Sequence, residues 1–226
     1  NCQSLTTIYA SDGFTTGEDI SSDGMFGGCL ELEGATSWDI AKTGIEMANF
    51  DGYFTPKIIT PYVKWDASTK VLTFKVANNK EEGAYDLNEG ENEPKWVSEV
   101  YSDCEEVVFT PSFNHAKPTS CYMWFYGFSR LTTIQGIENL NTEKVTDMNS
   151  MFGGCTVLKS LDLSSFNTVN VTGMRFMFSY CERLTSLNVS KFNTEKVTDM
   201  GAMFGDCSKL SSLDLSSFNT DEVTDM

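Results

Sequence analysis

The sequence predicts an α/β solenoid, a right-handed superhelix of short parallel strands and helical turns with a small β-hairpin in front of it. Three consecutive blocks, residues 148–173, 174–199 and 200–225, align without gaps at a period of 26. In each block an M-x-x-M-F run is followed by an L-x-x-L-x-L or L-x-x-L-x-V run. A repeat of this length buries its apolar positions only by stacking on its neighbours.

The alternation of apolar residues locates the strands. Leu161-x-Leu163 and its counterparts one and two periods later have the period of two that a short strand with one inward face shows. This pattern places the starts of turns at residues 104, 131, 158, 184 and 210. The M-x-x-M-F runs have apolar residues three and four apart, which predicts helical turns. The rows expected in the core are Cys155, Cys181, Cys207 and Phe166, Phe192, Phe218.

Residues upstream of the blocks have a different organisation. The runs Tyr62–Trp65 and Val71–Val76 flank a turn-prone segment, which predicts the β-hairpin. Met25–Cys29 repeats the letters of Met151–Cys155, which indicates a second array. We therefore expect the end of a preceding array with its cap over 1–54, a linker over 55–61, the hairpin and an acidic loop over 62–103, and the repeat solenoid over 104–226.

Composition excludes several classes of function. The chain has 32 Asp and Glu against 16 Lys and Arg, a net charge of −16, which repels nucleic acid backbones and anionic membrane surfaces. No apolar run approaches the roughly 18 residues that a membrane span needs. The single histidine, His115, limits zinc and general-base chemistry. We expect a protein that is not an enzyme and has no cofactor, with any export signal or anchor outside this chain.

The seven cysteines replace apolar residues of the repeat, and a buried free cysteine behaves as a small hydrophobe. We therefore expect buried thiols, with Cys104–Cys121 as the pair if a bridge forms. The sequence contains no C-x-x-C motif, so the cysteines do not suggest a metal site. The acidic loop offers Asp86, Asn88 and Glu91 to a cation, but it lacks the glycine and glutamate positions of an EF-hand loop, so a solvated loop is the preferred interpretation.

The outward side of the predicted strands is the candidate binding surface. Its residues, called the strand face below, are Ser160, Asp162, Ser164, Ser186, Asn188, Ser190, Ser212, Asp214 and Ser216. They are small and polar, without the aromatic or arginine anchors that dominate many interfaces. Two interpretations stay open: a merely soluble surface, or a shallow hydrogen-bonding face for a protein or a glycan.

The motif L-x-x-L-x-L-S-x-F-N-T-x-x-V-T-x-M-x-x-M-F-x-x-C resembles the 26-residue repeats of BspA-like bacterial surface proteins, a divergent leucine-rich-repeat family also found among mycoplasma surface lipoproteins. The resemblance covers residues 104–226 and extends recognisably to 1–32. It implies a leucine-rich-repeat-like fold, export to the cell surface or medium, and adhesion through protein binding on the strand face. The alternative function is a carbohydrate-binding scaffold of a surface glycan-handling protein.

The two ends of the sequence have nearly matching phases. The repeat pattern breaks off within a period at Met226, and Asn1-Cys2 begins close to the phase at which it stops. An uncovered repeat end has an unpaired strand edge, which proteins normally cover. We therefore expect either head-to-tail self-association through the ends or two boundaries cut from a longer array.

Overall fold

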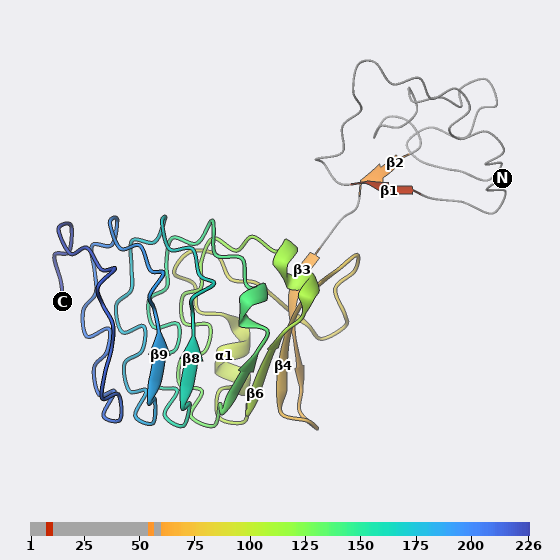
Figure 1. Cartoon of the computed structure of the whole chain (residues 1–226). Coiled ribbons are helices and arrows are strands. Elements are labelled where there is room, and N and C mark those ends of the chain that lie inside the picture. Colours follow the sequence, from red (N-terminus) through yellow and green to blue (C-terminus); the bar gives the residue numbers. More distant parts are fainter. Residues whose placement is uncertain (1–7, 11–53, 57–59) are drawn as a thin grey trace, which may run out of the picture. The chain divides into compact units, whose positions relative to one another are not determined.

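The structure, a computed structural model, describes residues 8–10, 54–56 and 60–226 (Figure 1). The chain divides into two compact units, residues 1–59 and 60–226. In the first unit, β1 (Ile8–Ala10) pairs in parallel with β2 (Phe54–Pro56). Apart from these two strands, the predicted array end over 1–54 and the centre of the predicted linker lie outside the described residues, so these two assignments stay predictions.

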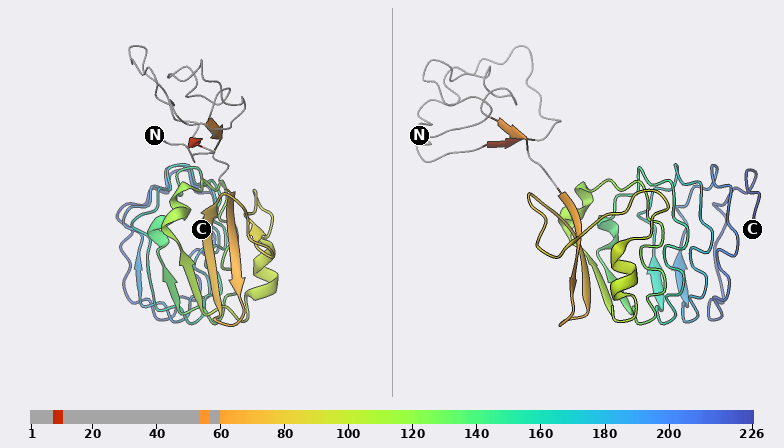
Figure 2. Two further views of the ribbon diagram at one scale, coloured as in Figure 1. Left: turned by 90° about the vertical axis from the view of Figure 1, so that its right-hand side faces the viewer. Right: turned by 180° about the vertical axis from the view of Figure 1, so that it is seen from behind.

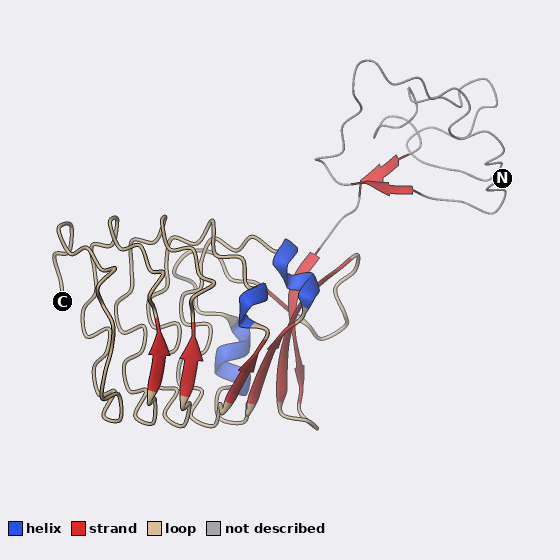
Figure 3. Cartoon of the chain, in the orientation of Figure 1, coloured by secondary structure: helices blue, strands red, loops and turns tan. Residues whose placement is uncertain are grey.

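The largest sheet of residues 60–226 has five strands in the order β5-β3-β4-β6-β7 (Figure 3). These are β3 (Thr60–Asp66), β4 (Val71–Ala77), β5 (Tyr85–Asp86), β6 (Glu106–Phe109) and β7 (Thr133–Gln135). β3 is antiparallel to β4 and β5, whereas β4–β6 and β6–β7 are parallel pairs. A separate parallel pair joins β8 (Ser160–Asp162) to β9 (Ser186–Asn188).

The predicted α/β solenoid of parallel strands is therefore wrong. β3 and β4 pair across the turn where the sequence predicts a hairpin, but this hairpin is not a separate lead-in. The free edge of β4 pairs with β6, so antiparallel and parallel strands share one mixed sheet. Residues 210–216, expected as a further strand, form none. Such pairing between distant segments is not visible in local periodicity.

The predicted helical turns are also wrong. The helices of residues 60–226 are α1 (Lys95–Val100) and the 3₁₀ helices η2 (Pro111–His115) and η3 (Ile137–Asn139). None of them lies in an M-x-x-M-F run. Across the described part of the chain, no helix has the length and apolar character needed to cross a bilayer.

Left-handed residues explain why the M-x-x-M-F runs are turns. Ser150 and Gly154 have φ of 56° and 77°, and Phe176 and Tyr180, one block later, have φ of 55° and 58°. A helix cannot continue through such residues. Alternate backbone amides bond to the next block, and those between them bond three residues back rather than four. The N–H of Phe152 donates to the carbonyl of Met177 at 2.9 Å, whereas the N–H of Met151 donates to the carbonyl of Met148 at 3.2 Å. Apolar residues three and four apart then face the core from a turn.

Residues one period apart lie side by side. Single parallel bridges join Ser120 to Asp147, Asp147 to Gly173, Gly173 to Asp199, and Asp199 to Asp225. The side chains that we call the Phe column stack through the interior with centroid separations of 5.5, 5.8 and 5.6 Å, in the order Phe125, Phe152, Phe178, Phe204. Phe166, Phe192 and Phe218 form a second stack, with separations of 6.4 and 6.3 Å.

One hydrophobic core joins the mixed sheet to the blocks. Phe74 of β4 stacks on Trp124 at 5.1 Å and meets Trp96 of α1 edge-on at 5.7 Å. The Trp96 indole N–H donates to the Trp124 carbonyl at 2.8 Å, and Trp124 donates to Asn88 Oδ1 at 2.6 Å. Phe125 then begins the Phe column. The views in Figure 2 show α1 on the side of the body away from β8 and β9.

Buried threonines tie each block to the next. The Thr168 hydroxyl donates to the Asn193 carbonyl at 2.8 Å and accepts the Asn193 N–H at 2.7 Å. Thr142 and Thr194 make the same two bonds one block earlier and one block later. All three threonines are at most 2 % exposed. Each hydroxyl therefore bonds to the N–H and the carbonyl of one asparagine in the next block, and these two backbone groups lie outside any regular strand or helix.

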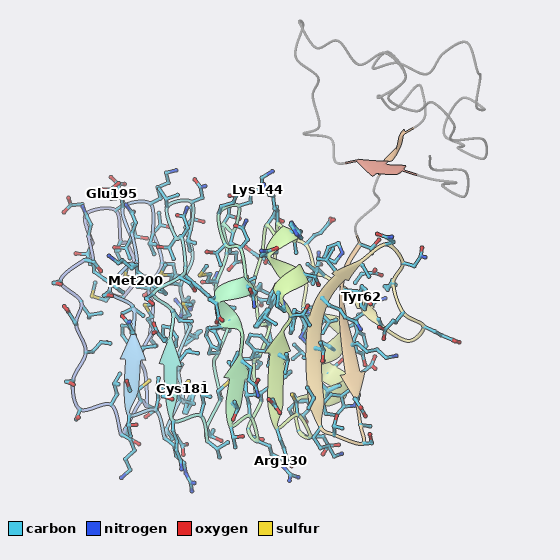
Figure 4. The ribbon with its side chains drawn as sticks, turned by 45° about the vertical axis from the view of Figure 1, so that its right-hand side comes forward. Tyr62, Arg130, Lys144, Cys181, Glu195 and Met200 are labelled. Atoms are coloured by element: carbon cyan, nitrogen blue, oxygen red, sulfur yellow. The ribbon has the colours of Figure 1, made fainter. Side chains whose placement is uncertain are left out.

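The five cysteines of residues 60–226 are free thiols, so the Cys104–Cys121 bridge is not formed. Four are buried and Cys207 is partly exposed. The Cys181 thiol donates to the Phe152 carbonyl at 3.2 Å and lies within the body in Figure 4. Burial raises the pKa of Cys104 and Cys181 to about 12.

These environments predict selective labelling. Because the thiolate is the reactive form, iodoacetamide at pH 8 should modify Cys207 well before Cys104, Cys121, Cys155 or Cys181 in the native protein. Denaturant should make all five equally reactive. Peptide mapping by mass spectrometry measures each site separately, and native labelling of Cys181 as fast as that of Cys207 would contradict the packing.

Candidate functional site

The structure brings most of the strand face together. Pairing of β8 with β9 sets Ser160 opposite Ser186 and Asp162 opposite Asn188. All nine residues are exposed except Asn188, which is half-buried. The residues from 212 to 216 have no strand of their own, but Ser212 and Asp214 line a hollow together with Ser186. The face is thus a set of polar rows that crosses three blocks.

Several of these side chains also hold their own turns. Asp162 Oδ1 accepts the Ser164 N–H at 3.0 Å and the Asn188 side-chain amide at 2.9 Å. Asp214 Oδ1 accepts the Ser216 N–H at 2.9 Å. These bonds, led by the backbone N–H in each case, lower the pKa of both carboxyls, so both carry a full charge at neutral pH.

Two shallow hollows adjoin the strand face. One, of about 470 Å³, is lined by Thr185, Ser186, Leu187, Ser212, Leu213 and Asp214. The other, of about 310 Å³, lies beside Ser160 and Asp162 and includes Ile134, Ile137 and Glu138. Both combine carboxylates with hydroxyls and a few aliphatic side chains. Such a surface suits a polar or basic partner more than an apolar one.

Two of the three candidate cation ligands in the acidic loop are engaged in interactions with other side chains of the protein. Asp86 is paired with Lys80 at 2.6 Å, and Asn88 accepts the Trp124 indole N–H. Glu91 is exposed. Among residues 60–226, no three His, Cys, Asp or Glu side chains are grouped as a metal site would need.

A second surface has no counterpart among the site residues that the sequence predicts. A groove of about 610 Å³, called the aromatic groove below, is lined by Tyr122, Met123, Tyr126, Gly127, Ser150, Gly153, Gly154, Phe176, Ser179 and Tyr180. In the described part of the chain, the aromatic side chains more than a third exposed are Tyr101 (46 %), Tyr126 (46 %), Phe176 (37 %) and Tyr180 (55 %). Tyr101, the residue after α1, extends this surface, because a Cβ added to Gly127 would lie 3.6 Å from its ring.

The groove arises from a difference between neighbouring blocks. Backbone pairing aligns Gly127 with Gly153 and Gly154 with Ser179, so small residues of the middle block lie between two blocks that carry aromatic side chains. The signal was present in the sequence: Tyr126, Gly153 and Ser179 occupy one position of successive blocks, and Gly127, Gly154 and Tyr180 occupy the next. Exposed aromatic side chains at positions that vary between blocks are candidates for binding residues.

Asp147 lies at the Tyr122 end of the groove. Its carboxylate accepts the Asn149 N–H at 2.8 Å, but burial raises its pKa, and the charge of Glu91 raises it further. Burial also raises the pKa of Tyr122, followed by the charges of Asp147, Glu91 and Glu93. The native state therefore holds Asp147 in an environment that disfavours its charge.

Asp147→Asn is expected to stabilise the protein at pH 7, because the amide keeps the bond to Asn149 and carries no charge. The rise in Tm should be at most about 4 °C, which corresponds to roughly 1 kcal/mol in a domain of this size. A pKa raised by folding makes wild-type stability fall as pH rises from the unfolded value, 3.8, through the folded one. The gain should therefore vanish below pH 3.8 in thermal melts. An equal gain at pH 3 and pH 7 would contradict this assignment.

The fold and these surfaces define a class: an acidic, β-rich protein of stacked 26-residue blocks with a polar face on its strands and an aromatic groove on the side of α1. Residues 119–226 match the family model described as "Mycoplasma protein of unknown function, DUF285". That part of the chain is thus similar to a family of Mycoplasma proteins. No curated protein and no solved structure matches the chain.

Proposed function

We propose that this chain is a non-catalytic binding module, exported to a bacterial cell surface or secreted, that holds extracellular protein ligands on its strand face. The observation that carries the proposal is the register of β8 and β9, which aligns exposed polar side chains into rows. The BspA-like motif and the Mycoplasma family match support display outside the cell. Glycan binding, the alternative function, has its support at the aromatic groove.

Charge indicates the kind of protein ligand. Asp162, Asp214 and the nearby Glu138 give the strand face negative charge, within a chain of net charge −16. A basic surface on the partner would be attracted to it, and such attraction acts chiefly on the association rate and weakens with salt. The ligand is therefore expected to be a protein with a basic patch.

The test removes charge without disturbing the turns. In Asp162→Asn/Asp214→Asn the amide oxygens still accept the N–H groups of Ser164 and Ser216. Asp66→Asn is the matched control, because Asp66 also accepts a backbone N–H two residues on, from Ser68 at 2.8 Å, but lies at the end of β3. Binding to immobilised fibronectin, laminin and collagen is measured by surface plasmon resonance at 50 and 300 mM salt.

If proteins bind at the strand face, Asp162→Asn/Asp214→Asn should associate with a matrix protein more slowly than the wild type at low salt, by about threefold or more. Asp66→Asn should associate at the wild-type rate. If all three matrix proteins fail to bind, or the control loses as much as the double variant, the proposed function of this face is wrong.

A further inference from the structure

We propose that the aromatic groove is a binding site for a neutral saccharide chain. The groove shares no residue with the strand face, and the views in Figure 2 show α1, the helix that Tyr101 follows, away from β8 and β9. The inference therefore stands independently of protein binding on the strand face. It follows from the shape, the main-chain bonding and the charge of the groove.

The shape of the groove suits a flat ring with polar edges. Tyr126 lies on one side, Phe176 and Tyr180 lie on the other, and Gly153 and Gly154 form the floor between them. A Cβ on Gly153 would lie 3.2 Å from the Tyr126 ring and 3.1 Å from the Phe176 carbonyl, so the hollow exists because that side chain is absent. Aromatic faces contact the apolar faces of sugar rings, and hydroxyls such as those of Ser150 and Ser179 can bond sugar hydroxyls.

The main chain of the groove is already engaged. The N–H groups of Ser150 and Gly154 donate to Arg175 and Ser179 at 2.8 and 2.7 Å. Those of Phe176 and Tyr180 donate to Gly201 and Gly205 at 2.9 and 2.7 Å. A peptide that binds as an added strand needs unpaired main-chain groups at an edge. Recognition here depends on side chains, which favours a saccharide over an extended peptide.

Charge selects a neutral ligand. None of the ten lining residues is charged, although charged residues make up 21 % of the chain. The cation next to Phe176 in the sequence, Arg175, lies over the Phe176 ring at 4.6 Å and is paired with Asp199 and Asp225. Asp147, Glu91 and Glu93 act on Tyr122 at the other end. An anionic glycan would meet no free cation in the groove and would be repelled by the net charge.

The turn that the blocks share determines where the aromatic side chains lie. The positions of Phe176 and Tyr180 are also left-handed in the other blocks, at Met123, Ser150 and Ala202 and at Gly127, Gly154 and Asp206, so this conformation belongs to the turn itself. The block of Phe176 and Tyr180 carries an aromatic side chain at both positions, and both side chains are exposed. Together with Tyr126, they line the groove.

The test uses the full chain and calorimetric titration with defined hexasaccharides. The neutral probes are cellohexaose, chitohexaose, maltohexaose and mannohexaose, and the anionic probes are a heparin hexasaccharide and hexagalacturonate. The variants are Tyr126→Ala and Tyr180→Asn, since asparagine tolerates the left-handed conformation. Asp162→Asn/Asp214→Asn is the matched control on the strand face, and thermal melting verifies that each variant is folded.

The proposal predicts saturable binding of at least one neutral probe, a loss of about tenfold in affinity for each tyrosine variant, and no change for the strand-face control. Three results would overturn it: binding of no neutral probe, tighter binding of an anionic probe, or unchanged affinity in both folded tyrosine variants. Because protein binding is measured with other variants and other ligands, its failure is distinct from the failure of this proposal.

Discussion

Thr168→Val should lower the free energy of unfolding by about 2–4 kcal/mol. Valine has nearly the shape of threonine but neither donates nor accepts, so the Asn193 N–H and carbonyl both lose their partner. Thr168 is 1 % exposed, and water has little access to replace the hydroxyl. The loss therefore measures two unpaired backbone groups rather than a cavity. Urea denaturation followed by circular dichroism gives the value.

Thr168→Ser is the matched control. Serine keeps both hydrogen bonds and removes one methyl group, which should cost about 0.8 kcal/mol. Thr194→Val and Thr194→Ser should repeat the contrast one block later, since Thr194 makes the same pair of bonds to Asn219. If valine and serine cost the same at position 168, the hydroxyl does not hold the blocks together.

Phe178→Ala should cost about 3–5 kcal/mol, the range for truncating a buried phenylalanine. Its ring is fully buried in the Phe column, parallel to Phe152 and Phe204 within 3°. Truncation opens a cavity in the middle of the column, and both neighbouring rings lose a stacking partner. The fixed bridges between blocks prevent the structure from closing over the space.

Two further substitutions test this cause. Phe178→Leu keeps most of the volume and should cost less than about 1.5 kcal/mol. Phe204→Ala removes the same ring where it is partly exposed, so it should cost clearly less than Phe178→Ala. Chemical denaturation compares the three variants. An equal loss for Phe178→Ala and Phe204→Ala would show that column packing does not determine stability.

The period of 26 predicts which residues of neighbouring blocks lie side by side, because residues one period apart are stacked in both phenylalanine stacks. The sequence could not show how the M-x-x-M-F runs fold. Their apolar spacing is equally compatible with a helix and with a turn whose left-handed residues bond to the next block. The parallel pairing of β4 with β6 was hidden for another reason: it joins segments separated by α1 and the acidic loop.

A side chain of one block can replace a hydrogen-bond acceptor that the next block lacks, and this is recognised only in the three-dimensional structure. Gly173 occupies the position that Asp147, Asp199 and Asp225 occupy in the other blocks. It has no carboxylate that could accept the N–H of Arg175, two residues further along the chain. Asn149 of the preceding block fills the gap, because its Oδ1 accepts the Arg175 N–H at 2.7 Å. A Cβ on Gly173 would lie 2.6 Å from that amide. The two departures from the repeat therefore explain one another.

One of the two candidate surfaces, the strand face, could be predicted from the sequence, whereas the aromatic groove could not. Alternation along a strand is sufficient to predict outward side chains, and Ser160 and Asp162 are exposed. It does not show that Asp162 and Asp214 also hold turns. The aromatic groove combines residues from three successive blocks, with the small residues of the middle one as important as the rings on either side. Reading each block alone could not reveal it.

The mixed sheet and the stacked blocks of residues 60–226 share one hydrophobic core, so we expect them to unfold as one body. Figure 4 shows Tyr62 in the sheet region and Cys181 among the blocks, at some distance from each other along this body. The most direct test is hydrogen exchange measured by mass spectrometry in increasing urea, comparing peptides from β3–β4 with peptides from residues 148–181. Both sets of peptides should open with the same free energy and the same dependence on urea. Exchange of the block peptides at clearly lower urea, while β3–β4 stays protected, would contradict it.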